Sequence, residues 1–308
     1  MSRRQANFLC LLCAAIWGGG FIATSKALET FPPFLMLAVR FVGAALLSWI
    51  PVWFQKEPIR LTLIKKGALS GLFLYLAFAF QTVGLDLTET GMNAFLTSVN
   101  VVLVPYIAWL FLKQKPTGRI LAASLICLAG IGCLSLSEGS FQFRFGDLLS
   151  LICAFFFACQ IVALNGVQDE NPWTMNAVQM TTAAALSLPF AFLPGQQPKP
   201  IDLQAVLSCL YSIVLATFVC YLLQTAAQKY TSPSNASVLL STESLWANLF
   251  GWLILKETKS WIMVLGGLMI FAAVLMVEGK PEKAEEKDNK NSFLGKKKTD
   301  SNEITKKI

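Results

Sequence analysis

The chain has 308 residues, of which 55% are hydrophobic and only 14% are charged, and its formal net charge is +7. A water-soluble domain of this length needs a much more polar surface, so the composition excludes that class. Apolar stretches of about 20 residues follow one another nearly end to end, and each can cross a hydrocarbon core of roughly 30 Å. We predict ten spans, at approximately 7–28, 33–53, 67–86, 91–112, 118–137, 146–167, 173–193, 204–224, 234–255 and 260–277.

The distribution of basic residues predicts how these spans are oriented. The first span follows Arg3 and Arg4 without a small-residue cleavage site, so we interpret it as a retained helix. If the spans alternate in direction, most bases of the first half fall on one side, which marks the cytoplasm. We therefore expect a multi-pass protein of the cell membrane with a cytoplasmic N-terminus and, after ten crossings, a cytoplasmic C-terminus. The second half indicates this less clearly, because Lys256 and Lys259 fall on the opposite side.

The first two spans each contain a candidate functional feature. Gly18, Gly19 and Gly20 follow Trp17, and such a run allows either a close helix crossing or local unwinding toward a cavity. Arg40 lies inside the second span, where a charge near the bilayer centre costs roughly 2.5–3.5 kcal/mol. Arg40 is therefore expected either to face a partner or water inside the bundle, or to reach outward to the interface.

A repeat at a fixed offset of 143 residues relates the third and fourth spans to the eighth and ninth. Residues 81–114 and 224–257 share nine identities in 34 positions, among them the pair Gln81 and Gln224. Five helices in each copy is an odd number, so the second copy enters the membrane in the opposite orientation.

We therefore predict an all-α integral membrane fold of ten transmembrane helices, arranged as two inverted five-helix repeats. The first repeat covers residues 1–137 and the second covers residues 146–277. Residues 278–308 carry nine lysines and seven acids with few apolar residues, so we expect a disordered cytoplasmic tail there.

Glu243 is the strongest functional candidate, because it stands in the middle of the ninth span. Ionisable groups inside a transmembrane bundle usually face a substrate path. An ion pair between Glu243 and Arg40 is left open, and Pro105 is expected to kink the fourth span. The residues that we predict to bind substrate are Trp17, Arg40, Gln81, Asn100, Gln160, Gln224 and Glu243.

Cofactors and metals are not expected. All eight cysteines lie in apolar spans, and Cys10 and Cys13, although spaced like metal ligands, have no histidine or third cysteine nearby. The chain contains no histidine, which excludes a histidine-based proton relay, and no phosphate-binding loop of the Gly-x-x-x-x-Gly-Lys-Ser/Thr type. The expected partners are a small-molecule substrate and the lipid bilayer, not nucleic acid, and a homodimer is left open.

Several fragments occur in a familiar order: Trp17-Gly18 with Phe21, Arg40-Phe41, Gln81 to Leu85, Asn93 to Pro105, Tyr221 to Tyr230, and Glu243 to Glu257. Through these fragments the chain resembles the ten-helix EamA type of the drug/metabolite transporter superfamily. The resemblance extends from Phe8 to Val277. The resemblance implies transport of small metabolites such as amino acids, commonly outward, by alternating access between inverted halves. The family often has Glu-Pro where this chain has Glu243-Ser244, which predicts a missing kink, and an acid where it has Gln114.

The leading hypothesis is thus a secondary transporter that exports small metabolites. The serious alternative is a multidrug exporter, in which Glu243 attracts cations, but Arg40 would repel them if it faced the same cavity. An integral-membrane enzyme is a lower alternative, because it would need clustered acids, histidines or a nucleophile with its base. The only adjacent acid pairs, at 169–170 and 285–286, fall in an expected loop and in the tail.

Overall fold

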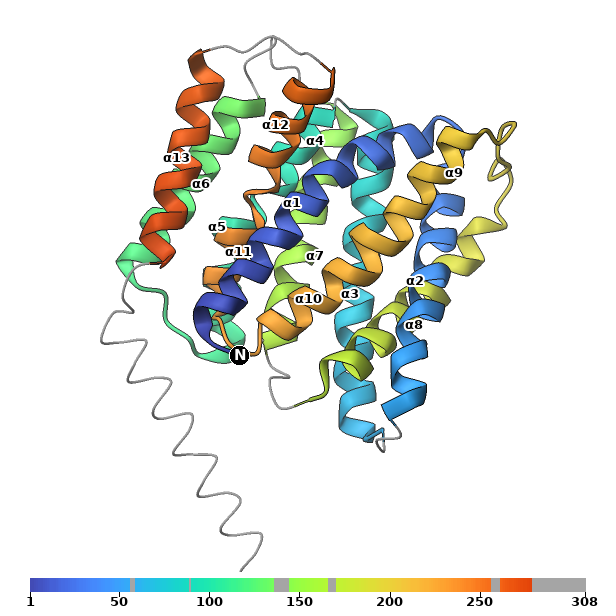
Figure 1. The fold of residues 1–308 in the computed structure, drawn as a ribbon, viewed down its shortest axis with the longest axis horizontal. Helices are drawn as coiled ribbons and strands as arrows, with labels where there is room; N and C mark the ends of the chain where they lie inside the picture. Colours follow the sequence, from blue (N-terminus) through green and yellow to red (C-terminus); the bar gives the residue numbers. More distant parts are fainter. Residues whose placement is uncertain (56–58, 89, 136–143, 166–169, 256–260, 279–308) are drawn as a thin grey trace, which may run out of the picture.

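The computed structural model describes residues 1–55, 59–88, 90–135, 144–165, 170–255 and 261–278 (Figure 1). Within these ranges the regular structure is entirely helical, and each of the ten predicted spans contains helix. Six helical segments of the described residues are long and apolar enough to cross a membrane. The predicted tail beyond Glu278 and most of the link at 137–146 lie outside the described residues.

The helices are apolar on nearly all sides, as expected where lipid surrounds the bundle and each helix must satisfy its own backbone groups. Some begin at clear caps: Ser2 and Gln5 form a reciprocal capping box, and the Ser232 side chain accepts from Asn235 N beside Pro233. The helices are α1 (Arg3–Leu28), α2 (Pro33–Gln55), α3 (Leu61–Leu87), α4 (Thr90–Thr97), α5 (Asn100–Leu112), α6 (Gly118–Ser135), α7 (Phe145–Asn165), α8 (Pro172–Ala191), α9 (Leu203–Leu210), η1 (Tyr211–Val219), α10 (Cys220–Ala227), α11 (Pro233–Leu240), α12 (Glu243–Leu255) and α13 (Trp261–Glu278).

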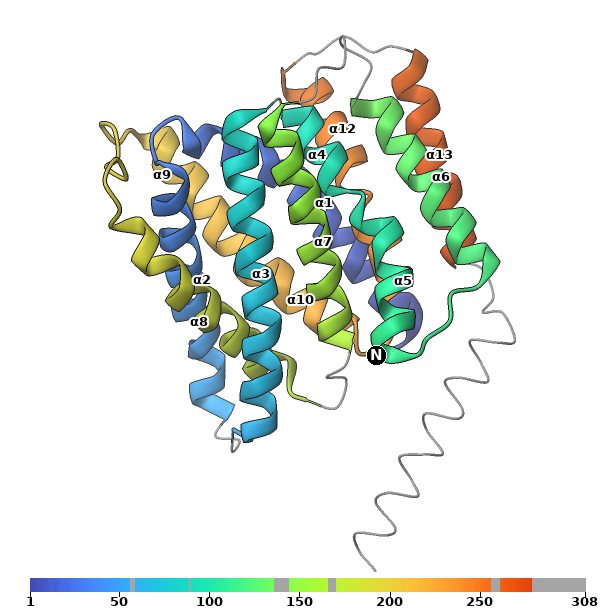
Figure 2. The ribbon, with the colours of Figure 1, turned by 180° about the vertical axis from the view of Figure 1, so that it is seen from behind.

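The helices pack in pairs across the bundle (Figures 1 and 2). Helices α6 and α13 lie side by side at one edge, α2 and α8 at the other, and α3 and α7 lie between them. Small residues bring backbones together: a Cβ atom on Gly130 of α6 would lie 2.7 Å from the Gly266 carbonyl oxygen of α13. Such close crossings are a common way for helices to associate in lipid, where apolar burial gives no driving force.

Two helices are interrupted at the centre of the bundle. The fourth predicted span is divided between α4 and α5 at Ser98–Val99, and the ninth is divided between α11 and α12 at Ser241–Thr242. The two breaks are 143 residues apart in the sequence, and the Ser98 and Ser244 hydroxyls meet at 3.4 Å. The prediction that the ninth span is a continuous helix is therefore wrong. The interruption forms although Glu243 is followed by Ser244 and not by a proline.

Pro105 does not cause the interruption of the fourth span. Helix α5 runs through Pro105 without ending, and the break lies before α5 begins at Asn100. The glycine run of the first span is likewise helical, because α1 is continuous from Arg3 to Leu28. Local unwinding at Gly18–Gly20 is therefore not observed, and close packing explains these glycines.

The eighth predicted span consists of three consecutive segments: α9, η1 and α10. The middle segment, η1, is a π-helix, which was not predicted from the sequence. Segments of this kind are rare and frequently occur at functional sites.

The first described helix begins, and the last one ends, at the same face of the bundle. The Arg3 guanidinium donates to the Val277 carbonyl oxygen at 3.2 Å, so the start of α1 and the end of α13 are neighbours. At this face the end of α2 and the start of α3 also lie, as Figure 1 shows. We refer to it below as the N-terminal face.

Candidate substrate cavity

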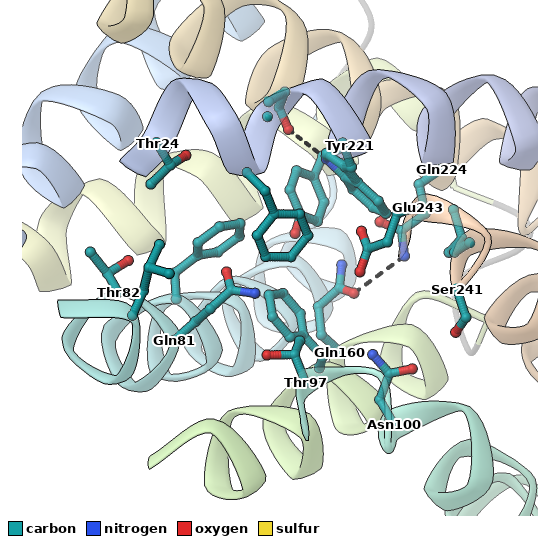
Figure 3. Close-up of a pocket in the computed structure, with 18 of the residues that line it drawn as sticks. Thr24, Gln81, Thr82, Thr97, Asn100, Gln160, Tyr221, Gln224, Ser241 and Glu243 are labelled. Carbon is teal, nitrogen blue, oxygen red and sulfur yellow. Dashed lines mark hydrogen bonds between the residues drawn. The ribbon is translucent and has the colours of Figure 1, made fainter. Parts of the chain in front are cut away.

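A cavity lies where the broken helices meet (Figure 3). It contains about 760 Å³ of space between the atoms, including its opening to solvent. All seven predicted residues line it, each from a different helix (α1, α2, α3, α5, α7, α10 and α12): Trp17, Arg40, Gln81, Asn100, Gln160, Gln224 and Glu243.

Glu243 reaches the cavity because it is the first residue of α12. The unbonded N–H groups and the dipole at the start of a helix favour a negative charge there. Helix α1 packs directly on this helix start: a Cβ atom on Gly18 would lie 2.9 Å from the Glu243 carbonyl oxygen and 2.6 Å from Trp246 Cβ. The close approach at Gly18 therefore holds α1 against the segment that presents the carboxylate.

Arg40 points into the bundle rather than outward to the interface, because it is only 5% exposed and lines the cavity. Its Nε–H donates to the Thr217 hydroxyl, and its guanidinium carbon lies 4.2 Å from the centre of the Phe78 ring. Such a cation–π contact offsets part of the cost of burying the charge.

The cation and the carboxylate do not neutralise each other. Among the described residues, neither Arg40 nor Glu243 has an ion-pair partner within 4.0 Å. The ion pair left open by the sequence is thus not formed. The cavity instead presents a guanidinium group from α2 and a carboxyl group from α12, and neither is in an ion pair within the described residues.

Aromatic rings form part of the cavity lining. Phe78 contacts Phe157 and Tyr221 edge to face, with ring centres 5.2 Å and 6.0 Å apart, and Tyr221 lies 5.2 Å from Trp17. The Trp17 indole N–H donates to the Ala216 carbonyl oxygen at 2.7 Å. Phe78 and Phe157 were missed from the sequence, although the 143-residue offset pairs Phe78 with Tyr221 and could have identified it.

One group of amide side chains lines the cavity. Gln81 and Asn100 lie across the cavity from Tyr221 and Gln224 in Figure 3. Gln224 Nε2 donates to Gln160 Oε1 at 3.4 Å, whereas its own Oε1 has no hydrogen-bond partner among the described residues. These four amides therefore offer both donors and acceptors to a polar molecule.

Other buried amides hold helices together instead of lining the cavity. Asn93 Nδ2 donates to Ser150 Oγ at 2.8 Å, which joins α4 to α7. Gln179 accepts from Ser70 Oγ at 3.0 Å and donates to Asn176 Oδ1 at 2.9 Å. The Asn248 side chain lies outside the described part of the structure.

A set of hydrogen bonds joins helices between the cavity and the N-terminal face. Asn165, the last residue of α7, donates through Nδ2 to the carbonyl oxygens of Gln228 at 3.1 Å and Thr231 at 3.2 Å. Gln228 Nε2 donates to the Ile161 carbonyl oxygen at 2.8 Å. These bonds join α7 to the turn between α10 and α11. Lys26, near the other end of α1, is exposed and pairs with Glu29 at 2.8 Å, so it does not face the cavity.

Interrupted helices that meet at a central cavity with polar and charged side chains in its lining, inside an apolar bundle, are characteristic of secondary membrane transporters. The model of the EamA-like transporter family matches residues 4–136 and 144–278 of the chain. The chain therefore belongs to this family and is a membrane transporter of the drug/metabolite transporter type.

Individual relatives agree with this assignment. An uncharacterized transporter of Archaeoglobus fulgidus is 33% identical over 280 residues, covering 90% of this chain and 87% of that protein. An S-adenosylmethionine/S-adenosylhomocysteine transporter of Chlamydia muridarum is 22% identical over 274 residues, covering 82% of this chain and 85% of that protein. A chain of known crystal structure matches with a TM-score of 0.76 and 18% identity over 90% of this chain and 99% of its own, which shows the fold alone.

Proposed function

We propose that this protein is a secondary transporter that exports small zwitterionic metabolites such as amino acids by alternating access. The observation that carries the proposal is the separation of charge in the cavity. Arg40 and Glu243 both line it without forming an ion pair within the described residues. An amino acid carries a carboxylate for the guanidinium and an ammonium group for the carboxylate, so it satisfies both.

The aromatic and amide residues fit the same class of substrate. Trp17, Phe78 and Tyr221 offer apolar surface to a side chain, while Gln81 and Gln224 offer hydrogen bonds. The relative from Chlamydia muridarum is named for two compounds that both contain an amino-acid head group. This supports a substrate that carries the same head group.

We propose that the N-terminal face is cytoplasmic. Arg3, Lys66 and Lys113 belong to the helix ends and loops predicted for that side, as the positive-inside rule requires. The N-terminus and the end of α13 lie together there, which agrees with two inverted five-helix halves of about residues 1–137 and 146–277. In this proposal the bonds of Asn165 help to close the cavity toward the cytoplasm.

Uptake into proteoliposomes tests the proposal. Purified full-length protein would be reconstituted and offered labelled leucine, methionine, phenylalanine and threonine one at a time, and separately ethidium, with and without a pH gradient. Flux of at least one amino acid above protein-free vesicles is expected. Dependence on the gradient would identify proton coupling, for which Glu243 is the acid that faces the cavity.

A multidrug exporter remains the second candidate, because aromatic rings beside Glu243 also suit an organic cation. The buried charge of Arg40 opposes it, since a second cation in the same cavity is repelled. Flux of ethidium without flux of any amino acid would contradict the zwitterion proposal and establish this alternative.

A further inference from the structure

We infer that Thr217, on the π-helical segment η1, is a positioning residue that orients the Arg40 guanidinium to bind the carboxylate group of the substrate. The inference rests on the proposed function and deepens it, because it assigns one end of the zwitterion to one end of the cavity. Thr217 does not line the cavity, and it acts through Arg40.

A hydrogen bond within η1 determines the orientation of the Thr217 hydroxyl group. It is fully buried and donates to the Ser212 carbonyl oxygen, five residues earlier, at 2.6 Å. A hydroxyl group has a single proton, so this bond leaves only its lone pairs for Arg40. The Arg40 Nε–H donates to that oxygen. The wide turn of η1 thus supplies an acceptor that faces Arg40.

Segment η1 is itself held against α1. The Tyr211 hydroxyl donates to the Ile16 carbonyl oxygen at 2.8 Å, and Trp17 donates to the Ala216 carbonyl oxygen at 2.7 Å. The acceptor for Arg40 is therefore attached to the same helix that carries the cavity residue Trp17. Supporting contacts of this kind keep the geometry of a binding side chain fixed.

The Nε–H and one face of the guanidinium are occupied by contacts. Nε is bonded to Thr217, and one face stacks on Phe78. The two terminal nitrogens carry no hydrogen bond and no ion pair within the described part of the chain. Because the guanidinium is planar, the edge formed by these two nitrogens matches the two oxygens of a carboxylate.

The opposite half of the bundle lacks this arrangement. Aligning Pro33 with Pro172 and Met36 with Met175 makes Gln179 the residue equivalent to Arg40 in the second half of the chain. Gln179 is neutral, fully buried and bonded to neighbouring side chains, so it is not available to a substrate. Carboxylate recognition is thus confined to the side of Arg40, and the ammonium group is directed to Glu243.

Competition between an amino acid and its carboxamide measures this recognition directly. The carboxamide retains the ammonium group and the side chain but has no negative charge. Flux of whichever of leucine, methionine, phenylalanine and threonine is transported fastest would be inhibited by its unlabelled acid or its carboxamide. The ratio of the two half-inhibitory concentrations reports the carboxylate contact alone.

Wild-type protein should prefer the acid by at least about tenfold, as expected for a charge-assisted bidentate contact. Thr217→Val, which keeps the shape and removes the hydroxyl, should reduce that ratio by about tenfold and change inhibition by the carboxamide by less than about twofold. Thr217→Ser, the matched control, should retain the ratio because it retains the hydroxyl.

Several results would overturn the inference. Equal loss of inhibition by acid and carboxamide in Thr217→Val would mean a merely structural role, as would a Thr217→Ser variant as defective as Thr217→Val. A wild-type protein that transports amino acids without preferring the acid would remove the carboxylate assignment but leave the proposed function. No amino-acid flux at all would remove the proposed function and this inference with it.

A second variant keeps the test decisive if Thr217→Val does not fold. Arg40→Lys keeps the charge but has neither an Nε–H for Thr217 nor a planar edge for a carboxylate. It should reduce the ratio of acid to carboxamide inhibition as Thr217→Val does. An unchanged ratio in Arg40→Lys would overturn the inference.

Discussion

The two broken helices at the centre of the bundle share their backbone but differ in charge. The breaks at Ser98–Val99 and Ser241–Thr242 are 143 residues apart, and each is followed by a residue that begins a new helix and lines the cavity. In the first copy that residue is the neutral Asn100, and in the second it is Glu243. The pair Arg40 and Gln179 shows the opposite pattern, with the charge in the first copy.

This difference shows how two similar halves can form a cavity whose two sides carry different charged groups. A cavity with equal walls would accept a substrate in either of two orientations. Placing one cation on α2 and one carboxylate on α12 removes that equivalence without altering the helices that form the cavity. The charges, rather than the backbone, are therefore where substrate recognition should be tested.

The largest effect is expected from Glu243→Gln, which makes the start of α12 as neutral as Asn100 at the start of α5. Loss of a charged partner for the substrate's ammonium group costs about 2–5 kcal/mol, which corresponds to at least about a 30-fold loss of transport. Proteoliposome flux measures this, with a monodisperse gel-filtration peak as the control for folding. Unchanged flux with unchanged pH dependence would remove Glu243 from the mechanism.

Gly18→Ala should have the next largest effect, because it separates α1 from the start of α12. The added Cβ would lie 2.6 Å from Trp246 Cβ and 2.9 Å from the Glu243 carbonyl oxygen. Overpacking of this kind costs about 1–3 kcal/mol, and displacement of Glu243 should lower flux as well. The matched control is Gly118→Ala, where the new atom meets nothing within 4 Å. Equal thermal stability of the two variants would contradict the close approach.

Asn165→Ala should weaken the proposed closure at the N-terminal face. It removes the donor to the carbonyl oxygens of Gln228 and Thr231 and leaves both buried, at a cost of about 1–3 kcal/mol. Thr88→Val is the matched change at the opposite end, where Thr88 donates to Asp147 at 2.6 Å. We expect Asn165→Ala alone to increase labelling, from the N-terminal face, of a cysteine placed at Ser241 in a cysteine-free background. Equal labelling in both variants would show that Asn165 is not part of the closure.

Pro105→Ala is expected to have the smallest effect. Helix α5 already continues through Pro105, so restoring an N–H there should change stability by less than about 1 kcal/mol and flux by less than about threefold. The break should persist, because it lies at Ser98–Val99. Complete loss of flux with normal expression would place the centre of the mechanism at the proline and not at Glu243.

The sequence predicted the candidate site more completely than the path of the helices around it. All seven residues chosen because they are polar, charged or aromatic inside apolar spans line one cavity. Burying such groups in lipid is costly, so their positions along the chain already predict that they gather inside the bundle. The break before Glu243 and the π-helix of η1 were not predicted, because each depends on contacts between distant helices.

An all-helical membrane protein, the positions of its apolar spans, the 143-residue offset and the residues facing the interior could all be predicted from the sequence, because the bilayer penalises every unpaired polar group. The contacts of Arg40 with Thr217 and Phe78, rather than with Glu243, became visible only in the folded bundle. The bonds from Asn165 to the turn between α10 and α11 likewise appear only in the folded structure. The physical reason is that a hydrogen bond or ring contact depends on distances and directions between helices, which spacing along one chain does not specify.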